Sequence, residues 1–212
     1  MAATPVSPIT VDPGLVTPAT AAADSVPGAT TTVATTVAPT TTVPVAERPP
    51  IAIGESVMLG ATSELQAGGF FVNADVSRTG EGIANIIGQY RASGTIGKII
   101  VIQAGTNGPV SAATYDQIMS HLPADEVSQV VFLTVKAPKG WIDGNNALIW
   151  ALPGKYPNVS VLDWAGLANQ ISGELSGSDG GVHLRTDKAK QFYANIIFDV
   201  IGRRDLQKPL PE

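Results

Sequence analysis

The sequence predicts a single α/β domain built on a parallel β-sheet, preceded by an extended segment. From Ile51 onward, short apolar runs alternate with segments whose apolar residues recur at helical spacing. The run Lys98–Gln103 is apolar almost throughout, which suits a strand covered on both faces. Residues 1–50 show neither pattern and consist mostly of Thr, Ala, Pro and Val. Alternation of strands and helices is typical of a parallel sheet with helices on both faces.

The segment 1–50 is expected to be a disordered stalk or linker. It has no aromatic residue and few charged ones, so it cannot bury enough surface to offset its chain entropy. Its Thr-rich stretch, residues 30–42, suits an extended stalk that carries O-linked sugars or a plain linker without them. The composition leaves both possibilities open.

The first half of the domain predicts two strand–helix units. Residues 51–53 form a short buried strand that ends at Gly54, and a helix follows over residues 57–66. A second strand spans residues 70–76. The next helix, over residues 82–92, has four large apolar residues at helical spacing: Ile83, Ile86, Ile87 and Tyr90.

The second half continues the alternation. Strands are expected over residues 98–103, 130–135 and 159–162. Helices are expected over residues 112–122, 145–152 and 186–203, the second of which stops at Pro153. The predicted domain therefore covers residues 51–205, with residues 206–212 as a tail. In this architecture ligands bind beyond the C-terminal ends of the strands.

The composition excludes several classes of function. There are 13 Lys and Arg against 18 Asp and Glu, so a nucleic-acid surface is not expected. The absence of Cys excludes disulfides and thiolate metal sites. His121 and His183 lie far apart without metal-binding spacing, so no metal is expected either. We find neither a signal peptide nor an apolar stretch that could span a bilayer.

Three polar residues adjoin predicted elements at one edge of the sheet. Ser56 opens a helix after the first strand, where a serine can be a nucleophile or simply an N-cap. Asn107 follows the central strand, where it can donate to an oxyanion or form an Asn-Gly turn. His183 precedes the last helix and can act as a proton acceptor or be a surface residue without function. Together they predict acyl transfer.

The segments that carry these residues resemble a known superfamily. Ile53–Gly60, Gly105–Pro109 and Asp179–Leu184 look like blocks I, III and V of the SGNH (GDSL-type) hydrolases. More narrowly, residues 51 to about 203 resemble the extracytoplasmic SGNH domain of membrane acyltransferases such as peptidoglycan O-acetyltransferases. The resemblance implies a flavodoxin-like three-layer α/β/α sandwich with a five-stranded parallel sheet of order 2-1-3-4-5. It also implies a serine acyl-enzyme mechanism with no cofactor.

The resemblance further implies a role for each site residue. Ser56 would be the nucleophile, His183 the base and Asp179 the acid that orients the imidazole. The oxyanion would be bound by the Ser56 N–H group and the Asn107 side chain. Block II falls at Val76–Gly80, where the backbone N–H of Ser77 or Arg78 is a further candidate donor.

Two positions depart from the pattern of the superfamily. Glu55 stands where block I has Asp, so the local hydrogen bonds of the shorter acid are in question. Asp179 lies four residues before His183 instead of three. An inserted glycine that loops out would restore this contact. Otherwise the site would be a Ser-His dyad, in which a backbone carbonyl could orient the imidazole. Asp163, at the end of the last strand, is a further candidate for this role.

Aromatic and cationic residues near the predicted site suggest how a glycan could bind. Trp141 and Trp164 lie just beyond strands and are candidates for contact with sugar rings, whereas Trp150 fits the apolar pattern of a helix and is expected in the core. Arg78 could bind an acidic glycan or be a solvated loop residue.

The leading hypothesis is transfer of an acetyl or similar short acyl group from a donor to a hydroxyl of a cell-envelope glycan, such as peptidoglycan. An extracytoplasmic carbohydrate esterase would need the same residues. A catalytically impaired glycan-binding module is the third possibility, suggested by Glu55 and by the spacing of Asp179. The stalk and the resemblance imply an extracytoplasmic domain that is part of, or coupled to, a membrane acyltransferase.

Overall fold

The computed structural model describes residues 44–212, so most of the predicted stalk lies outside the described residues. Residues 44–50 include a short 3₁₀ helix, η1 (Val45–Glu47). Directly after it, Arg48 Nη1 donates a hydrogen bond to the Ile96 carbonyl at 2.8 Å. Contact with the domain therefore begins before the first strand. Within residues 44–212, no helix is both long and apolar enough to cross a membrane.

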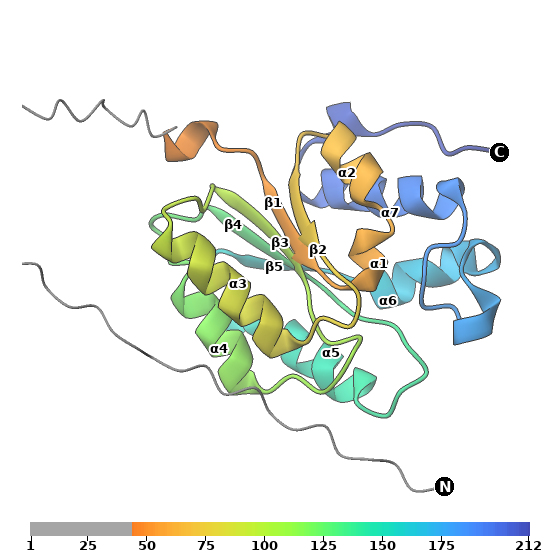
Figure 1. Ribbon diagram of the computed structural model, residues 1–212, viewed down its shortest axis with the longest axis horizontal. Helices are drawn as coiled ribbons and strands as arrows, with labels where there is room; N and C mark the ends of the chain where they lie inside the picture. The colour runs from red at the N-terminus through yellow and green to blue at the C-terminus, as the bar shows by residue number, and fades with distance from the viewer. Residues whose placement is uncertain (1–43) are drawn as a thin grey trace, which may run out of the picture. The chain divides into compact units, whose positions relative to one another are not determined.

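The domain is built on five parallel strands in the order β2-β1-β3-β4-β5 (Figure 1). The strands are β1 (Ile51–Gly54), β2 (Phe71–Ala74), β3 (Ile99–Gln103), β4 (Gln129–Leu133) and β5 (Val159–Leu162). The central strand β3 pairs with β1 and β4, and four of its five residues are buried. Both the sheet class and the strand order predicted from the sequence are confirmed.

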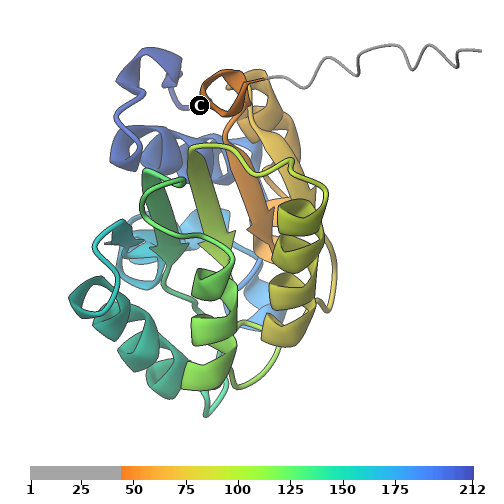
Figure 2. The same ribbon diagram turned by 90° about the vertical axis from the view of Figure 1, so that its left-hand side faces the viewer.

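Helices cover both faces of the sheet (Figure 2). The side chains of β1 and β3 alternate between two apolar clusters, because successive residues of a strand point to opposite faces. Ala52 and Val101 pack with α1, α2, α6 and α7, whereas Ile53 and Ile102 pack with α3, α4 and α5. The helices are α1 (Ser56–Leu59), α2 (Thr62–Ala67), α3 (Gly80–Ala92), α4 (Ala112–Ser120), α5 (Ile142–Ala151), α6 (Trp164–Leu167) and α7 (Asp187–Val200).

The structure differs from the predicted elements in several places. The helix predicted over residues 57–66 is two helices, because the chain turns at Gly60 and Thr62 Oγ1 donates to the Leu59 carbonyl. Their apolar residues enter the same cluster, so the spacing alone could not reveal the break.

The sequence did not predict the short helix α6 after β5. It also did not predict four 3₁₀ helices: η2 (Leu152–Gly154), η3 (Ala168–Glu174), η4 (Gly177–Asp179) and η5 (Arg204–Leu206). The predicted tail is tied to α7, since Lys208 and Asn195 exchange two hydrogen bonds.

Candidate active site

Ser56, His183 and Asp179 form one hydrogen-bonded chain at the C-terminal edge of the sheet. Ser56 Oγ lies 2.8 Å from His183 Nε2, and His183 Nδ1 lies 2.6 Å from Asp179 Oδ2. Ser56 is the first residue of α1, and the N-cap position belongs to Glu55. The serine is therefore not an N-cap, and its hydroxyl is directed at the imidazole.

The loop that carries His183 accommodates the additional residue between Asp179 and the histidine. Gly180 and Gly181 have φ values of 78° and 80°, in the left-handed region where glycine is favoured. The loop is closed at its base by the bridge between Leu175 and Leu184. Asp179 can thus contact His183 from four residues away, and its Oδ1 also accepts the Val182 N–H at 2.9 Å.

The environment of Asp179 favours its ionised form. Partial burial would raise the pKa of this carboxyl, but the hydrogen bonds from His183 and the Val182 N–H outweigh burial and lower the pKa below the ordinary value of 3.8. An ionised carboxylate at Nδ1 holds the imidazole in the tautomer whose Nε2 can accept a proton from Ser56.

A side chain at Gly180 is expected to disrupt this loop. In Gly180→Ala the new Cβ would lie 2.9 Å from Pro138 Cγ, and alanine is strained at this φ. We expect esterase turnover to fall about tenfold or more and stability to fall by about 1–3 kcal/mol. Gly177→Ala is the matched control, because its Cβ would meet no atom within 4 Å. Equal turnover and equal urea midpoints for the two variants would contradict this account of the loop.

Glu55 anchors the loop that carries Asn107. Its side chain is fully buried, and its carboxylate accepts the N–H groups of Gly105 at 3.0 Å, Thr106 at 2.8 Å and Asn107 at 3.5 Å. Burial raises the pKa of Glu55, while these N–H groups act in the opposite direction. The longer acid at this position therefore makes well-defined contacts, which answers the question raised by its departure from the Gly-Asp-Ser pattern.

Asn145, on α5, holds the same loop in place through hydrogen bonds, a role that the sequence did not suggest. Its Nδ2 donates to the carbonyls of Gly105 and Gly108, both at 2.8 Å, and its Oδ1 accepts the Val110 N–H at 2.9 Å. Trp141 Nε1 adds a longer contact of 3.4 Å to the Thr106 carbonyl. An asparagine on a helix gives no signal of such a contact, because the partner loop lies far away in the sequence.

Glu55→Gln is expected to destabilise the domain. The amide can accept on one side only, and its NH₂ group would face N–H donors, which leaves buried donors unpaired. We expect a loss of about 2 kcal/mol in urea unfolding, within the range for such groups. Glu126→Gln removes a solvent-exposed pair with Arg91 instead and is expected to cost less than about 1 kcal/mol. Equal costs for the two variants would contradict the anchoring role.

The loops after β2 and β3 carry N–H groups that are available as donors. Asn107 Nδ2 donates to the Arg78 carbonyl at 3.0 Å, which leaves one of its two N–H bonds for another acceptor. Within residues 44–212, the backbone N–H groups of Ser77 and Arg78 donate to no protein acceptor. Ser77 has a φ of 55°, an uncommon value for a non-glycine residue.

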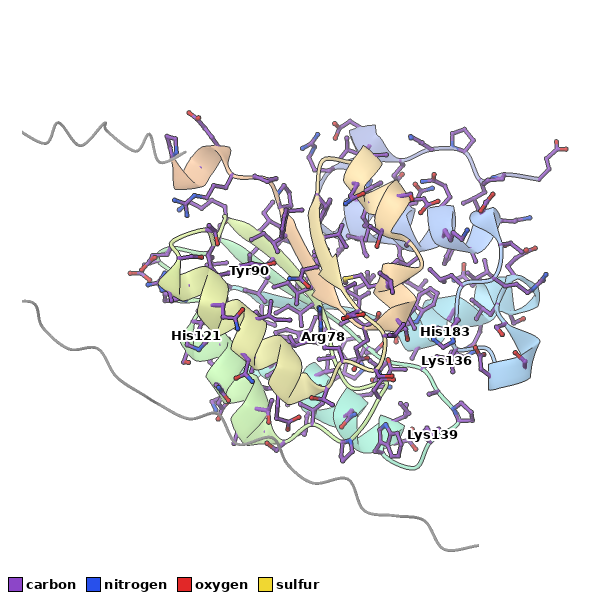
Figure 3. All side chains as sticks on the ribbon, viewed as in Figure 1. Arg78, Tyr90, His121, Lys136, Lys139 and His183 are labelled. Carbon is purple, nitrogen blue, oxygen red and sulfur yellow. The ribbon has the colours of Figure 1, made fainter. Side chains whose placement is uncertain are left out.

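Two predicted site residues have structural roles instead. Arg78 points inward, as Figure 3 indicates, and its guanidinium donates to the Gly54 carbonyl and to the carbonyl and side chain of Asn73. Its donors are thus used by the fold, and binding of an acidic glycan by Arg78 is not supported. Asp163 caps α6 through the Gly166 N–H and accepts Thr134 Oγ1. It therefore does not orient His183.

The tryptophans are arranged differently from the prediction. Trp164 is only 1% exposed and packs edge-on against Tyr193, with ring centroids 4.9 Å apart. It belongs to the core, so its predicted contact with sugar is wrong. Trp150 is 52% exposed and was wrongly expected in the core. Trp141 is half-buried beside the Asn107 loop and remains a candidate for substrate contact.

The arrangement supports nucleophilic chemistry at Ser56. A serine, a histidine and an ionised acid in this order can transfer the serine proton as the oxygen attacks an acyl carbon. Among the described residues, no group of His, Cys, Asp and Glu side chains is placed to hold a metal ion.

Solved structures with the same fold include acyl-transfer and lipolytic proteins. The C-terminal catalytic domain of peptidoglycan O-acetyltransferase A (OatA) from Streptococcus pneumoniae, with a methylsulfonyl adduct, superposes with a TM-score of 0.65 at 23% identity. The match covers 78% of this chain and 98% of that domain. A G-D-S-L family lipolytic protein from Veillonella parvula has a TM-score of 0.55 at 16% identity, over 73% of this chain and 98% of that one.

A curated relative matches at the level of sequence. "Putative peptidoglycan O-acetyltransferase YrhL" of Bacillus subtilis (strain 168) is 27% identical over 149 residues, which are 69% of this chain. The match spans 23% of the length of that relative. No family model matches the chain.

Proposed function

We propose that this domain transfers an acetyl or similar short acyl group to a hydroxyl of a cell-envelope glycan, such as peptidoglycan, through an acyl-enzyme on Ser56. The observation that carries the proposal is the chain of contacts from Ser56 Oγ to His183 at 2.8 Å and from His183 to Asp179 at 2.6 Å. Similarity to two peptidoglycan O-acetyltransferases supports the substrate class.

In the first half-reaction Ser56 Oγ attacks the acyl carbonyl of the donor while His183 Nε2 takes its proton. The carbonyl oxygen becomes an oxyanion that the Ser56 N–H, the free N–H of Asn107 and a backbone N–H at Ser77 or Arg78 stabilise. Each such donor is worth about 3 kcal/mol of barrier in comparable sites. The tetrahedral intermediate then expels the leaving group, which receives the proton from His183.

In the second half-reaction a glycan hydroxyl gives its proton to His183 Nε2 and attacks the acyl carbon. Collapse of this intermediate releases the O-acylated glycan and returns the proton to Ser56. Asp179 stays ionised in both steps and stabilises the imidazolium. In both half-reactions the protons and the acyl group move only between these residues, the donor and the acceptor.

Hydrolysis is the second candidate function, and the exposure of the site favours it. The His183 side chain is 46% exposed, so water can reach the same position as a glycan hydroxyl. An extracytoplasmic carbohydrate esterase would therefore use the same residues. The third possibility, an impaired glycan-binding module, was suggested by Glu55 and by the spacing of Asp179. Glu55 accepts a hydrogen bond from the Gly105 N–H, and Asp179 contacts His183. Neither residue therefore gives a reason to expect an impaired site.

The test is product analysis with the full chain. The protein is given p-nitrophenyl acetate as donor and purified peptidoglycan glycan strands as acceptor, and O-acetyl esters on the glycan are measured by mass spectrometry alongside free acetate. Transfer predicts ester on the glycan that increases with acceptor concentration. Release of acetate alone would assign the esterase function, and no turnover at all would reject both.

We also propose that the domain acts on the extracytoplasmic side of a membrane and is coupled to a membrane acyltransferase that supplies the acyl group. The predicted stalk and the greater length of the curated relative support this arrangement. Protease added to intact cells that produce the native protein should remove the domain. Protection of the domain from protease would contradict the location.

A further inference from the structure

The loop between β4 and α5, residues 134–141, borders the loop that carries His183. A methyl group at Gly181 would lie 3.3 Å from Lys136 Nζ, and one at Gly180 would lie 2.9 Å from Pro138 Cγ. Figure 3 shows Lys136 next to His183, with Lys139 further along the same loop. The ammonium group of Lys136 therefore lies beside the backbone two residues before the histidine.

The charge of Lys136 is not neutralised within the part of the chain that the structure describes. No hydrogen bond or ion pair of this side chain is found there, whereas Lys155 and Lys190 are paired with Asp116 and Asp187. The acid in the adjacent loop, Asp179, is already engaged by His183 and the Val182 N–H. Lys136 as a whole is partly buried, and its ammonium group, which has no partner among the described residues, is suited to bind an anion from solution.

The far end of the same loop contacts the other side of the site. Trp141 Nε1 donates to the Thr106 carbonyl at 3.4 Å, so its indole ring lies against the Asn107 loop. One continuous loop thus touches the loop of the proposed base through Lys136 and that of the proposed oxyanion donor through Trp141. A ligand that follows this loop would meet a cation at one end and an aromatic ring at the other.

We propose that the acceptor glycan lies along the β4–α5 loop and that Lys136 binds an anionic substituent, a carboxylate or a phosphate, carried by the acceptor near the reacting hydroxyl. The inference rests on the proposed acyl transfer and adds to it the class of acceptor. Lys136 thus takes the anion-binding role first considered for Arg78, whose guanidinium donates to Gly54 and Asn73 instead. The whole chain has a net charge of −5, so a local cation beside the site would favour the binding of an acidic glycan.

Glycan binding and transfer are measured with three acceptors of similar length. These are a neutral chito-oligosaccharide, a peptidoglycan strand that has lost its stem peptides and exposes lactyl carboxylates, and a phosphorylated chito-oligosaccharide. Affinities come from titration calorimetry, and transfer from p-nitrophenyl acetate is quantified as O-acetyl ester. The full chain is compared with Lys136→Gln, Lys136→Arg and, as a control remote from the loop, Lys208→Gln.

The wild type and Lys208→Gln are expected to prefer an anionic acceptor over the neutral one. Which anion is preferred, the lactyl carboxylate or the phosphate, shows which substituent the acceptor carries. Lys136→Gln should reduce this preference about tenfold, as expected for one charged hydrogen bond, and Lys136→Arg should restore most of it. The preference is a ratio, so it does not depend on the fraction of folded protein. An unchanged ratio in Lys136→Gln would overturn the inference while leaving acyl transfer intact. Charge-selective binding without any ester product would instead reject the proposed transfer and leave the anion site standing.

Discussion

Ser56→Ala is expected to abolish turnover of p-nitrophenyl acetate, with a fall in kcat of about a thousandfold or more. The hydroxyl lies 2.8 Å from His183 Nε2 and is placed to form the acyl-enzyme, and alanine offers no replacement. Covalent labelling by a fluorophosphonate should be lost together with turnover. The measurements are the steady-state rate and the labelled fraction by intact-protein mass spectrometry.

The fold of this variant should be unaffected, which separates a nucleophile from a capping serine. Ser56 is the first residue of α1 and caps nothing, whereas the Ser111 hydroxyl accepts the Thr114 N–H at the start of α4. Ser111→Ala is therefore expected to lose about 1 kcal/mol of stability and to keep full labelling. If Ser56→Ala retained labelling, or lost as much stability as Ser111→Ala, the assignment of Ser56 would be wrong.

Asp179→Asn is expected to lower kcat about a thousandfold with little change of fold. The amide can present its NH₂ group to His183 Nδ1, which places the imidazole proton on Nε2 and removes the acceptor for the Ser56 proton. It also removes the negative charge that stabilises the imidazolium. Asp205→Asn is the matched control, because this carboxylate is also ionised and paired, with Arg203, in the C-terminal region.

The same variant should change how stability depends on pH. The pKa of Asp179 is lowered in the folded protein, so its ionised form contributes stability above the ordinary value of 3.8, and this contribution is lost as pH falls through the folded value. Asp179→Asn should thus be less stable than the wild type at neutral pH, with a difference that shrinks toward about pH 3. Urea midpoints at both pH values test this. A constant difference, or near-normal turnover, would show that His183 does not depend on Asp179.

The fold could be predicted because the sequence patterns that indicate its strands and helices involve residues close together in the chain. The continuous apolar run of β3 and the helical spacing of α3 and α7 each depend on neighbouring residues in the chain. The break at Gly60 was not predictable in the same way, since α1 and α2 bury their apolar residues in one cluster. Trp164 and Trp150 were misplaced because the short helix α6 turns the former into the core, while helical spacing alone does not fix which face of α5 is covered.

The site residues that lie next to a predicted strand or helix could be predicted from the sequence, whereas contacts between distant segments could not. Ser56, Asn107 and His183 were identified from their positions next to elements. The anchoring of Gly105–Asn107 by Glu55, across about fifty residues, could not be inferred from sequence, nor could the clamp by Asn145. Arg78 was expected either to bind an acidic glycan or to be a solvated loop residue. Its acceptors at Gly54 and Asn73 come from two separate strands, so the sequence could not indicate them.

The central claim is that the acyl group passes through Ser56, and trapping the intermediate tests it most directly. The full chain is mixed with p-nitrophenyl acetate, quenched in acid within seconds and digested, and the peptide that contains Ser56 is analysed by mass spectrometry with and without a chase of glycan acceptor. We predict an acetyl group on Ser56 that disappears faster in the presence of glycan, with matching ester on the glycan. Turnover without acetyl on that peptide, or with acetyl on another residue, would contradict the account.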